Sequence, residues 1–135
     1  MKNIIFSVLS MFIASSSVAD INVPEGQDTI TWVFAECRAI DAASSRLELK
    51  DDYYNQPGYE SKNKWETSFW NLALSYYKDN PDITRVGNGR ADAMAKIELD
   101  LLTNRLNTEN WDAAMLNCGE AYKLLTMDLV KKMEQ

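Results

Sequence analysis

The fold of this chain is decided by the stretch from Trp111 to Leu129, WDAAMLNCGEAYKLLTMDL. Its apolar side chains recur every three or four residues, the spacing that places side chains on one face of an α-helix. A half-buried β-strand would alternate apolar and polar residues, and this stretch does not. The predicted apolar face consists of Trp111, Met115, Cys118, Tyr122, Leu125 and Leu129. The stretch therefore predicts an amphipathic helix that begins at Asn107 or Thr108.

Three earlier segments have the same spacing. The first follows Asp28, a good N-cap residue, the second follows Ser61, and the third begins near Arg90. Residues rich in Pro, Gly and Asn, at 55–58 and 79–89, separate these segments. The predicted core positions are Ile30, Val33, Cys37, Ile40 and Leu47 in the first, Trp65, Phe69, Leu72 and Tyr76 in the second, and Ala95, Leu99, Leu102 and Leu106 in the third. Four amphipathic helices with short links predict an all-α, up-down-up-down four-helix bundle.

The chain has two cysteines, Cys37 and Cys118, and both lie on predicted core faces. The first and fourth helices are neighbours in an up-down-up-down bundle, so the two thiols can meet. Catalytic cysteine pairs are usually spaced C-x-x-C, and this pair is not. We therefore predict a structural disulfide between helices 1 and 4, which would close a loop of roughly 80 residues and stabilise the fold by at most about 4–5 kcal/mol.

Residues 1–19 have the form of a cleaved signal peptide. Lys2 supplies a positive charge, residues 4–14 are mainly apolar, and Ser17-Val18-Ala19 is a small-x-small cleavage sequence. The apolar run is about 11 residues, whereas a membrane-spanning helix needs about 20, which disfavours a membrane anchor. We expect cleavage before Asp20, a single helical domain over 20–135, and a periplasmic or secreted protein without stable membrane association.

The composition of the 135 residues limits the chemistry. The chain has no His, so His-dependent catalytic triads, the common zinc protease sites and His-ligated haem are excluded. Its 14 Lys and Arg residues against 20 Asp and Glu residues give a net charge of −6. This balance disfavours nucleic acids and anionic membranes, and it favours a positively charged partner. We expect neither a cofactor nor a metal site.

Aromatic residues outside the core faces are the best candidates for a binding surface. Tyr53, Tyr54 and Tyr59 lie in or next to a polar link, and tyrosine is common at protein interfaces. Alternatively, these rings form a lid over one end of the bundle. Trp32 lies off the core face of the first helix and Trp70 flanks that of the second, so either would mark an interface if exposed. The alternative is a wide core face that buries both indoles.

Carboxylates are plentiful on the predicted helices. Glu36, Asp41 and Glu48 lie on the first helix, and Glu98 and Asp100 lie on the third. A glycosidase needs two carboxyl groups that face each other across a cleft, and no sequence pattern places a pair in that way. We interpret these residues as a solvated or ion-paired face, with no catalytic residue assigned.

In its size, leader, helices and cysteine pair, the chain is similar to acid-stress chaperones and to immunity proteins against secreted amidases. This is a likeness of layout, and no functional residue is transferred from it. We expect a small exported non-enzymatic binding protein that acts on a protein partner, and an inhibitor or immunity role is one that fits this class. The first alternative is an acid- or stress-responsive periplasmic chaperone. The second alternative, which has less support, is a carboxylate-dependent enzyme. A homodimer formed through the second helix also stays open.

Overall fold

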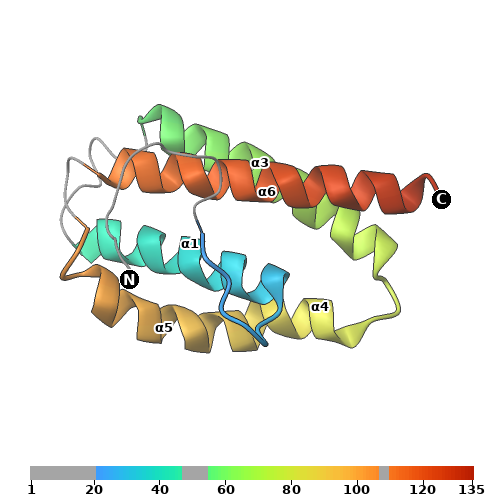
Figure 1. Cartoon of the computed structure of the whole chain (residues 1–135), viewed down its shortest axis with the longest axis horizontal. Coiled ribbons are helices and arrows are strands. Elements are labelled where there is room, and N and C mark those ends of the chain that lie inside the picture. Colours follow the sequence, from blue (N-terminus) through green and yellow to red (C-terminus); the bar gives the residue numbers. More distant parts are fainter. Residues whose placement is uncertain (1–20, 47–54, 107–109) are drawn as a thin grey trace, which may run out of the picture.

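The computed structural model describes residues 21–46, 55–106 and 110–135. The predicted signal peptide, Tyr53 and Tyr54 therefore lie outside the described residues. The helices are α1 (Thr29–Arg46), α3 (Pro57–Tyr76), the continuous series α4 (Pro81–Arg85), η2 (Val86–Arg90) and α5 (Ala91–Leu102), and α6 (Trp111–Met133). They alternate in direction along the bundle (Figure 1), and the described residues contain no strand. The predicted all-α four-helix bundle is confirmed.

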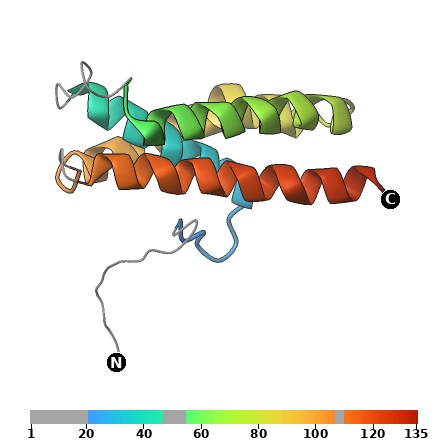
Figure 2. The same ribbon diagram turned by 90° about the horizontal axis from the view of Figure 1, so that it is seen from above.

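The four helical stretches form two tightly packed pairs. Helix α3 packs along α6 and α1 packs along α5, while α1 also contacts α6. Figure 2 shows α3 and α6 running side by side in the same direction. The core lies between the pairs, and its largest fully buried side chains include Trp111, Tyr122, Phe69 and Met115. The predicted face of α6 is confirmed, with five of its six residues buried and Leu125 packed against them.

The predicted disulfide is present. Cys37 of α1 and Cys118 of α6 are bonded, their Cα atoms are 5.8 Å apart, and both residues are 0% exposed. Because α1 belongs to one helix pair and α6 to the other, this bond ties the two pairs together. A disulfide of this kind indicates an oxidising compartment outside the cytoplasm.

Of the predicted starts of the first two helices, one agrees with the structure and the other does not. The N-cap at Asp28 is confirmed, because its Oδ2 accepts hydrogen bonds from the backbone N–H and the hydroxyl of Thr31, each 2.8 Å long. The predicted start after Ser61 is wrong, since α3 already begins at Pro57. Proline suits the first helical position because its fixed φ is helical and it has no N–H to satisfy. The next N–H, from Gly58, donates to Asp112 Oδ1 of α6 at 2.9 Å.

The predicted break at Gly87-Asn88-Gly89 is also wrong. The segment forms a π-helical turn that joins α4 to α5, and among the described glycines only Gly26 has a positive φ, of 85°. Val86 and Ala91 explain the turn, because both are buried, at 4% and 0% exposure. Side chains five residues apart point about 140° apart in a regular α-helix, and the wider π turn brings them to one side.

Gly119 lies at a close approach of two helices. A Cβ at this position would lie 2.7 Å from Ser61 Oγ and 3.1 Å from the backbone N of Lys62. The neighbouring helix at this position is α3. Only a residue without a side chain allows the backbones of α3 and α6 to meet at this point.

Replacing Gly119 by alanine should therefore destabilise the fold despite the better helix propensity of alanine. We expect Gly119→Ala to lower the free energy of unfolding by about 1–3 kcal/mol, because the Cβ forces α3 away from α6. The matched control is Gly87→Ala, where an added Cβ meets nothing within 4 Å. That control should raise the free energy of unfolding by about 0.5–1 kcal/mol. Urea denaturation measures both, and equal stability of the two variants would contradict this account of the helix contact.

Candidate functional site

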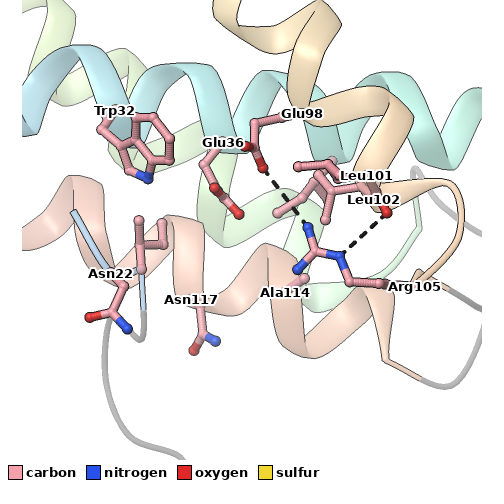
Figure 3. Close-up of a pocket in the computed structure, with 11 residues that line it drawn as sticks. Asn22, Trp32, Glu36, Glu98, Leu101, Leu102, Arg105, Ala114 and Asn117 are labelled. Carbon is pink, nitrogen blue, oxygen red and sulfur yellow. Dashed lines mark hydrogen bonds and ion pairs between the residues drawn. The ribbon is translucent and has the colours of Figure 1, made fainter. Parts of the chain in front are cut away.

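The best candidate site is a cleft of about 590 Å³ between α1, α5 and α6, which the amino-terminal segment borders (Figure 3). Its apolar lining includes Ile40, Leu102 and Ala114, and its polar lining includes two glutamates, one arginine and two asparagines. The side chains come from three helices, the segment before α1 and the segment after α5, so the cleft exists only in the folded bundle.

Trp32 and Glu36 supply the α1 side of the cleft. They are four residues apart, so their side chains project to the same side of the helix, one turn from each other. Both are half-buried, and Figure 3 shows the indole beside the carboxyl groups. Trp32, predicted from sequence as a binding residue, thus lies in a concave site with charged neighbours.

Glu98 of α5 reaches the same point from the opposite side. Its side chain is only 12% exposed, and its carboxyl group lies close enough to Glu36 to affect the pKa of that residue through charge and hydrogen bonding. Burial, together with the nearby Glu98 charge, raises the pKa of Glu36 to about 7, and Arg105 opposes this rise. A carboxyl–carboxylate hydrogen bond requires one proton between the two groups. The pair is therefore poised to lose that proton near neutral pH.

Arg105 lies at the lip of the cleft, beyond the end of α5. Its Nη2 is 3.9 Å from Glu98 Oε2, and its Nε donates a hydrogen bond of 3.3 Å to the carbonyl of Leu101. The arginine side chain is 60% exposed. Because the Arg105 guanidinium is exposed and distant, it offsets the negative charge of the two glutamates only weakly.

The structure does not bring the described aromatic candidates into one site. Trp32 lines the cleft, whereas Trp70 of α3 packs edge-on against Phe34 and Phe69, with ring centroids 5.0 and 5.1 Å away. Tyr59, also of α3, packs partly on the core and lines a separate polar depression. Of these three, Trp32 has the neighbours that best fit recognition of a charged group.

Sequence reasoning considered Glu36 and Glu98 but did not pair them. A signal was available, because each glutamate directly precedes a core residue, Cys37 or Leu99. Such a position lies at the edge of the buried face of its helix. The missing information was that α1 packs beside α5, which brings the two edges together.

A second ionisable cluster lies inside the bundle and is closed. Lys62 of α3 is 3% exposed, and its Nζ is 2.7 Å from Asp41 Oδ2 of α1 and 3.0 Å from Glu66 Oε1. Tyr122 of α6 donates its hydroxyl to Glu66 Oε2 at 3.1 Å, and burial raises the pKa of Tyr122 well above its ordinary value. The cluster joins three helices, and its lysine is enclosed and already bonded to two carboxylates.

Comparisons with known protein families, characterised proteins and solved structures found no match for this chain. Within residues 21–46, 55–106 and 110–135, no helix is long and apolar enough to cross a membrane. In the same described part, no three Cys, Asp or Glu side chains gather as a set of metal ligands.

The raised pKa of Glu36 makes stability depend on pH. A carboxyl whose pKa is about 7 when folded and 4.5 when unfolded holds its proton more tightly in the folded state. Its stabilising effect is full below the lower value and is lost as pH rises through the higher value. From pH 5 to pH 8 we expect the free energy of unfolding to fall by about 2 kcal/mol. Glu36→Gln, which keeps a hydrogen-bond donor for Glu98, should flatten this profile and should be the more stable protein at pH 8.

Urea titrations at several pH values measure this effect. Glu60→Gln removes an exposed carboxyl from α3 and is the control, which should keep the wild-type slope. A profile for Glu36→Gln that follows the wild type would show that Glu36 does not carry the pH dependence.

The enclosed cluster gives a further prediction about stability. Lys62→Met should lower the free energy of unfolding by about 2–4 kcal/mol, because two carboxylates lose their shared cation in a largely buried place. The loss should be below that of a fully buried pair, since Asp41 is 31% and Glu66 20% exposed. Lys64→Met changes an exposed lysine on the same helix and should stay within about 0.5 kcal/mol of the wild type. Thermal and urea unfolding measure the stability of both variants. If Lys62→Met is as stable as the wild type, Lys62 does not have the structural role described.

Proposed function

We propose that this protein is a small, exported, non-enzymatic binding protein that holds a protein partner through the cleft around Trp32. One observation carries the proposal: a half-buried indole and a pair of carboxyl groups share an open concave site on a bundle held by a disulfide. Aromatic side chains with one accessible face are frequent anchors at protein interfaces.

The surface beside the cleft supports a protein partner. Leu101 at the lip is 53% exposed, and Ile97, one turn earlier on α5, is 66% exposed. Residues four apart share one helix face, so these two side chains form an apolar strip that continues from the cleft. Apolar side chains gathered next to a polar pocket are typical of an interaction surface.

The disulfide and the predicted signal peptide together support export to the periplasm or beyond it. An inhibitor or immunity role fits a rigid surface, because a preorganised site loses little conformational entropy on binding. In this proposal the Trp32 cleft replaces the predicted tyrosine link as the main recognition site.

The two alternative functions have less support. An acid-activated chaperone must loosen as pH falls, whereas burial raises the pKa values of Glu36 and Asp41 and so favours the folded state at lower pH. A carboxylate-dependent enzyme gains some support from the Glu36–Glu98 pair. However, retaining glycosidases keep their carboxyl groups about 5–5.5 Å apart with the substrate between them, and here the two groups bond to each other.

Affinity capture tests the proposal. The oxidised protein is used as bait in an extract of exported proteins, beside Trp32→Ala and Trp65→Ala baits. Trp65 is the matched control, because it is also a half-buried tryptophan but lies on α3. We expect one stoichiometric partner on the wild-type and Trp65→Ala baits, and at least about tenfold less of it on Trp32→Ala, as truncation of an aromatic anchor predicts. Circular dichroism confirms that each bait is folded, and retention of the partner by folded Trp32→Ala would refute the cleft as the site.

A further inference from the structure

We infer that the group recognised in the cleft is an arginine side chain of the partner, held between the face of Trp32 and the carboxyls of Glu36 and Glu98. This inference rests on the proposed function and names the chemistry that the partner supplies. The cleft, the indole wall and an arginine of the chain itself, already aimed into the site, each support it.

The lining matches a guanidinium in shape and charge. A guanidinium is planar, so it stacks on an indole face, and it donates paired hydrogen bonds to carboxylates. Trp32 offers the face, and Glu36 of α1 and Glu98 of α5 offer acceptors that meet beside it (Figure 3). The chain as a whole is acidic, with a net charge of −6, which favours approach of a basic surface.

Arg105 shows that the geometry accepts a guanidinium. Its side chain points to Glu98 (Figure 3), but the nearest nitrogen–oxygen distance is 3.9 Å and the side chain is 60% exposed. An arginine that enters more deeply gains closer contacts with both carboxylates. It would therefore displace Arg105, which returns to water at small cost because it is already exposed.

Entry of the cation expels the proton shared by the two carboxyls. A positive charge beside Glu36 favours its ionised form, so binding and proton release are coupled. The charged groups that face Glu36 are Glu98 on α5 and Arg105 after it. Among the described residues, the cleft lining from α6 and from the segment before α1 is neutral and consists of Ala114, Asn117, Ile21 and Asn22. Binding should therefore strengthen as pH rises through neutrality.

The test uses the full oxidised protein and a capped peptide, acetyl-Gly-Arg-Gly-amide. The matched probe contains citrulline, which has the same shape as arginine but no charge. Titration followed by the NMR signal of the Trp32 indole N–H measures both affinities. We expect the arginine peptide to bind at least about tenfold more tightly than the citrulline peptide, and about tenfold more tightly at pH 8 than at pH 5.5.

Three variants define the site. Glu36→Gln should remove the pH dependence, and Glu98→Gln should weaken the arginine peptide at least about tenfold, as loss of a charged acceptor predicts. Arg105→Gln should strengthen binding several-fold, because it removes the internal competitor. Glu60→Gln is the control for lost negative charge elsewhere and should bind as the wild type does. Equal binding of the two peptides, or equal binding at the two pH values, would overturn the inference.

The captured partner separates this inference from the proposed function. If Trp32→Ala loses the partner while Glu98→Gln retains it and the arginine peptide does not compete, the proposed function stands and the arginine inference is wrong. If folded Trp32→Ala retains the partner, the proposed function is wrong, whatever the peptide does.

Discussion

The contact between the backbones of α6 and α3 at Gly119 is the constraint on which the rest of the bundle depends. A Cβ at this position would lie 3.1 Å from Lys62 N, so the backbone of α6 packs directly against the backbone of α3. Two other links between helices, a disulfide and an ion pair, lie at the same level of the bundle. Cys118, the preceding residue, is bonded to Cys37 of α1, and Lys62 reaches Asp41 of the same helix. Three helices are thus fixed to one another within about one turn of α6.

This junction also determines the shape of the cleft. Glu36 precedes Cys37 and Asn117 precedes Cys118, and both line the cleft. The disulfide that joins the cysteines therefore fixes one cleft residue of α1 relative to one of α6. Rigid support of this kind lowers the entropy that binding must overcome. The same covalent bond that stabilises a small core thus preorganises the candidate site.

The sequence could predict the features that depend on one helix at a time. The 3–4 spacing of α6, the cap at Asp28 and the cysteines on core faces all follow from local periodicity or side-chain chemistry. The start of α3 at Pro57, the continuous helix through Gly87 and the pairing of Glu36 with Glu98 depend on which helices are neighbours. Gly58 N–H donates to Asp112 of another helix, and Val86 and Ala91 share one core. The periodicity of a single segment does not show which helices pack together. The pairing of Glu36 with Glu98 therefore could not be predicted, although both residues were named from the sequence.

The bundle contains two clusters with similar chemistry and opposite accessibility. In the enclosed cluster, Lys62 lies within 3.0 Å of two carboxylates and is itself 3% exposed. In the open cleft, the arginine that faces Glu36 and Glu98 remains 60% exposed and 3.9 Å away. A buried carboxylate pair is stable only with a proton or a close cation. The enclosed pair has its own cation, whereas the open pair relies on a proton that it loses near pH 7. Of these two clusters, the open pair is therefore the one whose negative charge the chain itself balances less completely.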